Sequence, residues 1–328
     1  MLPTRRFAFV VPYYGNWPRY WRLWAESAAN NRRFDFLILT DLPRPEPIAD
    51  NVHIVPMRYA EVSRRLSGVL GFSLPNLATY HKICDFKPFY GLAFADLLGS
   101  YQYWGYCDVD LFFGDLQPLV EAAESERFDF ISPWEYTVGC CTLLRNEARV
   151  NQIALQIPNL RARLFEPENT FTDEGAISET AVLAGDFSFG VIANVAQELR
   201  KVKPFLAATA TPDGRVVGMP GWFLLHSNDG RITLYDDDLQ GHEPLLFHFM
   251  GMKNTRFWCD LEKCDLNRFS FTSYGITPGL LDPSLKHSAA FRARCLRAHL
   301  TGQMYRSVRN CIPHAIIRKL KESRRNHL

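Results

Sequence analysis

The chain has 328 residues, of which 47% are hydrophobic and 22% are charged, and its formal net charge is +2. These proportions are typical of a soluble globular protein and exclude an intrinsically disordered chain. No run of residues approaches the roughly 18 consecutive apolar positions that a membrane-spanning helix needs. A chain of this length accommodates one large α/β domain or two average domains.

The N-terminus opens with a short apolar stretch, residues 7–11, directly after Arg5 and Arg6. Pro12 ends this stretch before it reaches the ~7–15 residues of a signal-peptide core. We therefore expect a first β-strand over residues 6–12 and no signal peptide.

Strand-like and helix-like segments alternate along most of the chain. Further strands are expected at residues 34–40, 52–56, 101–106, 128–132, 139–144 and 245–249. Helical segments are expected at residues 21–28, 59–69, 76–98 (interrupted by Pro88) and 148–155. This alternation predicts an α/β fold with a mostly parallel sheet that helices cover on both faces. We expect residues 1–260 to form one domain and residues 261–328 to form a C-terminal extension.

The most informative pattern is the pair Asp108 and Asp110, which follows an apolar, aromatic strand. Alternate residues of an extended segment point the same way, about 7 Å apart at Cα, so the two carboxylates can converge on one cation. Mg²⁺ and Mn²⁺ prefer such oxygen ligands. A solvated loop is the alternative for a bare D-x-D pattern, but paired carboxylates beside an apolar strand are costly without a cation. We therefore predict a metal site here.

Four segments in chain order carry a family resemblance. They are 12–18 (PYYGNWP), Thr40-Asp41, 82–88 (KICDFKP) and 105–115 (GYCDVDLFFGD). Together they resemble bacterial polysaccharide-biosynthesis proteins that look like GT-A fold glycosyltransferases of capsule and O-antigen assembly. The resemblance implies a Rossmann-like nucleotide-binding domain, a metal-binding D-x-D motif and transfer of a sugar from a nucleotide-sugar donor, with a UDP-sugar favoured. The implied acceptor is a saccharide or a lipid-linked saccharide.

Residues at the ends of the first two strands are candidates for holding the base and ribose of such a donor. The Tyr13 ring can stack on a base, and Gly15 allows close approach of the backbone. The Asp41 carboxylate can accept hydrogen bonds from a base or ribose, although a turn or helix-cap acid is an equal alternative.

A lysine–aspartate–lysine group lies further along, at Lys82, Asp85 and Lys87. Lys82 and Asp85 are three residues apart and can share a helical face. The functional interpretation places both lysines on the donor phosphates and Asp85 on a sugar hydroxyl. The alternative is a surface ion pair.

The late segment 246–253 (LFHFMGMK) resembles the histidine–glycine–lysine stretch of glycogenin-like retaining glycosyltransferases. That resemblance implies that His248 is a third metal ligand and that Lys253 contacts phosphate, and it slightly favours retention of anomeric configuration. The match is imperfect, because Lys253 comes one residue early and Asn254 stands where that family has proline. A histidine packed in the core is the alternative.

Asp173 and Glu174 are the candidates for the acid/base or acceptor-side carboxylate. Sugar transfer passes through an oxocarbenium-like state, and an inverting enzyme needs a base for the acceptor hydroxyl. A pair of acids at a helix N-terminus is the alternative.

The C-terminal segment is strongly basic, since residues 286–328 contain eleven Lys/Arg and a single acid, Glu322. Ala293, Leu296, Leu300 and Met304 form an apolar stripe among the arginines, which predicts contact with an anionic membrane surface. Packing on the body of the protein and a disordered end are alternatives. Nucleic acid is not expected as a partner, because no stacking aromatics are interleaved with the arginines.

The eight cysteines are scattered without paired C-x-x-C spacing, as expected in a reducing cytosol. The sequence therefore predicts a cytoplasmic metal-dependent glycosyltransferase, peripheral at the inner face of the membrane. Two alternatives stay open. One is a sugar-phosphate or nucleotidyl transferase with the same metal site, and the other is a non-catalytic nucleotide-sugar-binding assembly subunit.

Overall fold

The computed structural model describes residues 6–46, 48–74, 80–133, 137–191, 207–209, 221–249, 252 and 264–311. The chain divides into two compact units. The first unit combines Met1–Ala208 with Asp229–Thr233 and His242–His248, and the second contains the remaining residues. The chain therefore returns to its first unit late in the sequence.

The first unit is built on a seven-stranded sheet with the strand order β3-β2-β1-β4-β7-β6-β8. Its strands are β1 (Phe7–Pro12), β2 (Phe34–Thr40), β3 (Val52–Pro56), β4 (Tyr103–Cys107), β6 (Phe130–Ser132), β7 (Cys141–Arg145) and β8 (Phe189–Val191). All neighbouring pairs are parallel except those of β7, which runs antiparallel to β4 and β6. The predicted mixed α/β architecture with a mostly parallel sheet is confirmed.

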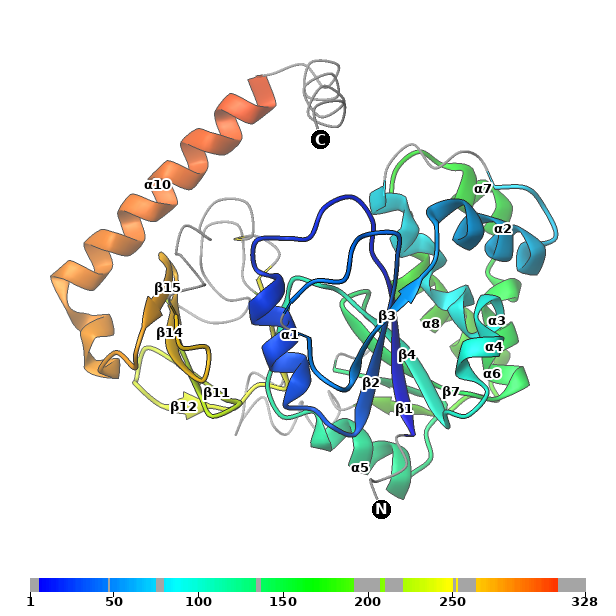
Figure 1. The fold of residues 1–328 in the computed structure, drawn as a ribbon, viewed down its shortest axis with the longest axis horizontal. Coiled ribbons are helices and arrows are strands. Elements are labelled where there is room, and N and C mark those ends of the chain that lie inside the picture. The colour runs from blue at the N-terminus through cyan, green and yellow to red at the C-terminus, as the bar shows by residue number, and fades with distance from the viewer. Residues whose placement is uncertain are drawn as a thin grey trace. The chain divides into compact units, whose positions relative to one another are not determined.

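Side chains of successive residues in β1 enter two different hydrophobic clusters. Phe7 and Phe9 pack on one face of the sheet, whereas Ala8 and Val10 pack on the other. This alternation follows from the pleat, and it requires both faces to be covered. The helices α1 (Trp21–Ala29) and α5 (Gln117–Ser125) contribute to the first cluster. The opposite face is covered by α2 (Tyr59–Leu70), α3 (Tyr90–Ala93), α4 (Ala95–Leu98), α6 (Ala148–Gln152) and α8 (Ile177–Ala184) (Figure 1).

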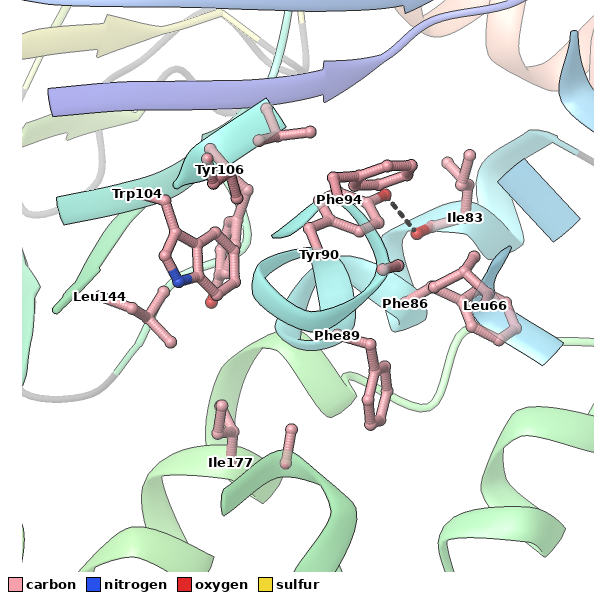
Figure 2. Packing of buried hydrophobic residues seen from close by; sticks show 14 of the residues in the cluster. Leu66, Ile83, Phe86, Phe89, Tyr90, Phe94, Trp104, Tyr106, Leu144 and Ile177 are labelled. Carbon is pink, nitrogen blue, oxygen red and sulfur yellow. Dashed lines mark hydrogen bonds between the residues drawn. The ribbon is translucent and has the colours of Figure 1, made fainter. Parts of the chain in front are cut away.

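The segment predicted as an interrupted helix over 76–98 is helical from residue 80 onward. It begins as a 3₁₀ helix, Tyr80–Phe89, and continues as α3 and α4. Phe86 and Phe89 are fully buried and pack with Tyr90 and Trp104 in the second cluster, shown in Figure 2. The Tyr90 hydroxyl donates to the carbonyl of Ile83 at 3.2 Å. This packing fixes the segment that carries Lys87.

Most of the other predicted elements are present with small shifts at their ends. The helix expected over 148–155 is α6 followed by a 3₁₀ turn, Ile153–Gln156. The strand expected at 245–249 is β13 (Leu246–His248), which belongs to a separate three-stranded sheet of order β5-β13-β9. The remaining elements of the first unit are β5 (Leu111–Phe113), α7 (Leu160–Phe165), a short π-type turn (Thr172–Ala176) and β9 (Ala207–Thr209).

The second unit contains an antiparallel arrangement in which β14 (Arg268–Thr272) pairs with β10 (Leu224–Asn228) and with β15 (Gly275–Pro278). The strands β11 (Arg231–Tyr235) and β12 (Gly241–His242) each contain residues of both units. A 3₁₀ helix, Pro283–His287, leads into one long helix, α10 (Ala289–Cys311). None of the helices in the described ranges is both long and apolar enough to cross a bilayer.

The six cysteines whose side chains the structure describes are all free thiols. Five of them are buried: Cys107, Cys140, Cys141, Cys264 and Cys295. Thiols in these positions pack as small apolar side chains.

Candidate functional site

The site is built around Asp108 and Asp110, which lie in the turn between β4 and β5. Two contacts fix the backbone of this turn. The amide of Asp108 donates to the carbonyl of Cys140 at 3.0 Å, and the Trp24 indole donates to the carbonyl of Asp108 at 3.1 Å. The side chain of Asp108 is 28% exposed, whereas that of Asp110 is 5% exposed. The pair therefore opens to solvent through Asp108.

A histidine that comes late in the sequence, at the end of the first unit's last segment, completes the cluster. The strand β13 pairs antiparallel with β5, in a register that sets His248 opposite Leu111. His248 Nε2 consequently lies 3.5 Å from Asp110 Oδ1 and 4.0 Å from Asp108 Oδ2. The ligand atoms of all three side chains lie within 4.8 Å of one another. The tertiary structure thus brings together the three residues predicted as metal ligands.

The donor set of this cluster fits a divalent cation. His248 Nε2 is buried and has no hydrogen-bond partner among the described residues, a costly state for a polar nitrogen. Coordination to a cation would satisfy that atom. Two carboxylate oxygens and one imidazole nitrogen match the ligand preferences of Mn²⁺, and the carboxylates also match those of Mg²⁺.

Lys87 connects the cluster to a third carboxylate. Its Nζ lies 2.7 Å from Asp108 Oδ1, 2.7 Å from the carbonyl oxygen of Gly139 and 3.4 Å from Asp173 Oδ2. Burial opposes the charge of this amine, but the neighbouring Asp108, Cys84 and Asp173 hold the pKa of Lys87 well above its usual value. Lys87 therefore stays protonated and supplies a fixed positive charge beside the acids.

Asp173 is almost completely buried, at 2% exposure. Tyr106 donates its hydroxyl hydrogen to the Asp173 carbonyl at 2.8 Å, and the preceding Phe171 adopts a positive φ of 54°. Burial raises the pKa of the Asp173 carboxyl to about 7, against the opposing effect of Lys87 and with a further rise from Asp108. Its Oδ1 atom has no hydrogen-bond partner in the described part of the chain. Asp173 is thus a carboxyl group that can exchange a proton near neutral pH.

Glu174 lies beside Asp173, at a break in the short π-type turn. Its backbone is non-helical, with φ −119° and ψ −112°, and its Oε1 accepts a 3.3 Å hydrogen bond from the amide of Gly139. A Cβ added at Gly139 would lie 2.5 Å from Asp173 Oδ2. The glycine is therefore what allows Asp173 and Glu174 to approach this loop.

Lys82 and Asp85 form a buried ion pair, at 2.6 Å, with side-chain exposures of 4% and 0%. Lys82 also donates to the carbonyls of Arg163 and Glu168, while Asp85 accepts from the amides of Thr170 and Thr172. The prediction that these two side chains contact the donor is corrected, because they face the protein interior and bind protein groups. The ion pair considered as the alternative is present, but it is buried and does not lie at the surface.

This buried pair has a consequence for the site. Asp85 holds the backbone on both sides of Phe171, and that backbone leads directly into Asp173. Lys82 and Asp85 therefore position the carboxyl of Asp173 indirectly, by fixing the backbone that precedes it.

The three residues predicted to hold the base and ribose have different surroundings. The Tyr13 ring stacks on Trp17, with centroids 5.5 Å apart and an interplanar angle of 11°. Burial, followed by the charge of Asp110, raises the pKa of Tyr13 to about 12, and its hydroxyl donates to the carbonyl of Asn16 at 3.0 Å. Gly15 adopts a φ of 105°, a conformation that favours glycine. Asp41 directly follows β2 and is exposed.

Sequence reasoning missed two features of this site. Tyr20 lies at the start of α1, and burial together with the charges of Asp110, Tyr13 and Asp108 raises its pKa. The Gly139-Cys140 turn supplies a carbonyl to Lys87 and one to the amide of Asp108. A glycine next to two cysteines just before a strand was the only local signal for the turn.

Lys253 lies outside the described residues.

Comparison with protein families matches most of the chain to a family model. A model described as a family of unknown function, DUF6625, matches residues 9–278. This range contains both aspartates of the turn, His248, Lys87 and Asp173. No curated protein matches the chain.

The buried pair gives a stability prediction. Changing Lys82 to Met leaves the Asp85 carboxylate buried without its cation, which should lower the free energy of unfolding by about 3–5 kcal/mol. Urea denaturation measures this change. The matched control is Arg64→Met, which breaks the exposed pair with Glu61 at the same i,i+3 spacing and should leave the free energy of unfolding almost unchanged. Equal costs for the two variants would contradict the stabilisation assigned to the buried pair.

The raised pKa of Asp173 gives a pH prediction. The unfolded chain ionises near the ordinary value of 3.8, whereas the folded protein holds the proton until about pH 7. The folded state binds more protons between these values, so its free energy of unfolding should fall as pH rises from about 4 to about 7. Asp173→Asn should remove this part of the pH dependence. Denaturation in a chelator at several pH values tests it, and parallel pH profiles for the two proteins would show that the Asp173 pKa is ordinary.

Proposed function

We propose a metal-dependent glycosyltransferase function for this chain, which belongs to the family of unknown function DUF6625. The observation that carries the proposal is the cluster of Asp108, Asp110 and His248 at the carboxyl end of β4. Ligands of open α/β sheets bind beyond the carboxyl ends of the strands. The proposed fold type is GT-A, and the proposed donor is a nucleotide-sugar, with a UDP-sugar favoured.

The proposed cofactor is Mn²⁺ or Mg²⁺, held by Asp108, Asp110 and His248. When bound, the cation would neutralise the charge that develops on the leaving nucleoside diphosphate. Lys87 supports this assignment, because its amine lies 2.7 Å from Asp108 and keeps its positive charge beside the place where phosphate would bind. A fixed positive charge in a partly buried site stabilises an anion more than it would in water.

The protein groups divide the other tasks. Tyr13, stacked on Trp17 and electrostatically close to Asp110, offers a flat surface for the base. Asp173 is the proposed group for the acceptor hydroxyl or the reactive face of the sugar, because its raised pKa suits proton transfer near neutral pH. Glu174 supports Asp173 through the Gly139 loop. Retention of anomeric configuration is favoured because the segment that contains His248 resembles that of glycogenin-like retaining glycosyltransferases.

The proposed acceptor is a saccharide or lipid-linked saccharide of bacterial surface polysaccharide synthesis. This would place the enzyme in the cytoplasm, at the inner face of the membrane. The helix α10 supports that location, since it contains five arginines and no acidic residue. Leu296 and Leu300, one helical turn apart, are 50% and 51% exposed in the second unit. Exposed leucines among arginines suit an anionic lipid surface.

Substitution of Asp110 tests the metal site. Asp110→Ala should keep the folded structure and lose detectable sugar transfer, because it removes one of three cation ligands. It should also abolish the Mn²⁺-dependent rise in melting temperature that a screen of nucleoside diphosphates and their sugars is expected to reveal. Asp115→Ala is the matched control, since Asp115 is an exposed acid in the same segment and should leave both properties unchanged.

The released product separates the proposal from its alternatives. Release of a nucleoside diphosphate supports glycosyl transfer, whereas pyrophosphate or a nucleoside monophosphate would indicate a nucleotidyl or sugar-phosphate transferase. A nucleotide-sugar that stabilises the protein with Mn²⁺ but is never turned over would indicate a non-catalytic subunit. Undiminished transfer by Asp110→Ala would remove the basis of the proposal.

Substitution of the exposed leucines tests the membrane contact. Leu296→Ser/Leu300→Ser should lower the fraction of protein that sediments with phosphatidylglycerol vesicles by roughly tenfold, because it removes apolar area that enters the lipid interface. Val182→Ser/Leu183→Ser is the control, since these residues are 65% and 82% exposed on α8, which itself contains no Lys or Arg. Equal sedimentation of all three proteins would contradict the assignment.

A further inference from the structure

A cavity lies in the first unit, away from the acidic cluster. Its volume is about 840 Å³, which is within the ~300–1,000 Å³ range of small-molecule sites. Four arginines line it: Arg6, Arg33, Arg127 and Arg145. No part of the proposed transferase mechanism uses these residues.

Sheet topology explains why the four arginines converge. Arg6, Arg33 and Arg127 come shortly before the parallel strands β1, β2 and β6. Arg145 is the last residue of β7, which runs the opposite way, so its end lies at the same edge. The cavity is therefore at the amino edge of the sheet, whereas Asp108 and Asp110 follow the carboxyl end of β4. The two sites lie at opposite edges of one rigid sheet.

The side chains that line the cavity carry more positive than negative charge. Of the lining residues only Glu124 and Glu147 are acidic, against four arginines. Glu124 pairs with Arg33, and Glu147 lies 3.0 Å from Arg145. Arg6 and Arg127 form no ion pair with any described residue. Two guanidinium groups therefore remain for a ligand.

Two further observations favour a ligand. The Nε atom of Arg33 is buried and has no hydrogen-bond partner within the described ranges, a state that an incoming acceptor would relieve. Tyr101 and Tyr103 also line the cavity and are fixed by hydroxyl bonds to Asp35 and to the carbonyl of Phe128. Anchored aromatic side chains provide contact area for a sugar or base at little cost in conformational entropy.

We propose that this cavity binds a phosphate- or carboxylate-bearing small molecule of nucleotide or disaccharide size. Arginine guanidinium groups suit this chemistry, because their parallel N–H donors match the oxygens of phosphate and carboxylate groups. Arg6 and Arg127 are the principal contacts. The site is independent of the metal cluster and of the proposed transfer reaction.

Calorimetric titration of the full chain tests this site. The titrants are inorganic pyrophosphate and glucuronate, both at low salt and in excess EDTA so that no cation occupies the acidic cluster. We expect at least one of them to bind, with the responding titrant identifying phosphate or carboxylate as the recognised group. Arg6→Gln/Arg127→Gln should weaken that binding by at least about tenfold, through loss of two charge-assisted contacts.

Two further proteins complete the experiment. Arg58→Gln/Arg231→Gln removes the same charge from exposed arginines outside the cavity, and it should bind as the wild type does. Asp110→Ala should also bind normally, because the metal cluster lies at the other edge. The proposal is wrong if neither anion binds, if the cavity variant binds as tightly as the wild type, if the charge-matched control loses as much affinity, or if Asp110→Ala loses binding.

Discussion

The crowding of negative charge at the carboxyl end of β4 constrains the rest of the site. Asp108, Asp110 and Asp173 lie in a largely buried space, where like charges repel more strongly than in water. Two features of the described residues lower this repulsion. Lys87 is held between Asp108 and Asp173 with its charge retained, and the pKa of Asp173 rises so that it is less often ionised. Within the cluster of Asp108, Asp110 and His248, the histidine is the one side chain that can carry positive charge. A divalent cation bound there would neutralise the two carboxylates.

Rigid packing behind the site keeps this arrangement in place. The Lys82–Asp85 pair has no access to a ligand, yet it ties the 3₁₀ segment to the backbone that carries Asp173. Trp24 and Cys140 hold the turn that carries Asp108. A group whose pKa depends on burial and on neighbours a few ångströms away needs such support, since a small displacement would change both.

The first unit presents opposite charges at the two edges of its sheet. The strands run mostly parallel, so residues that follow strands gather at one edge and residues that precede them gather at the other. Aspartates follow β4, whereas arginines precede β1, β2 and β6. The same topology that assembles the proposed metal site therefore also assembles the proposed anion cavity, although neither group of residues is contiguous in sequence.

The sequence by itself determined six of the seven strands of the central sheet and the central pair of the site, but it did not predict α5, α8 or the strands β10, β11, β14 and β15. Alternating apolar strands and helices predicted the α/β sheet, and two aspartates after an aromatic strand marked the cluster, because both signals depend on neighbouring residues. Tertiary structure alone decided which distant groups join them. His248 reaches Asp110 only through the pairing of β13 with β5, and Lys87 meets Asp173 only because both of their segments pack in the second core cluster. Which groups a buried lysine contacts depends on packing, so Lys82 and Lys87 look alike in sequence, but only Lys87 lies beside Asp108 and Asp173 in the fold.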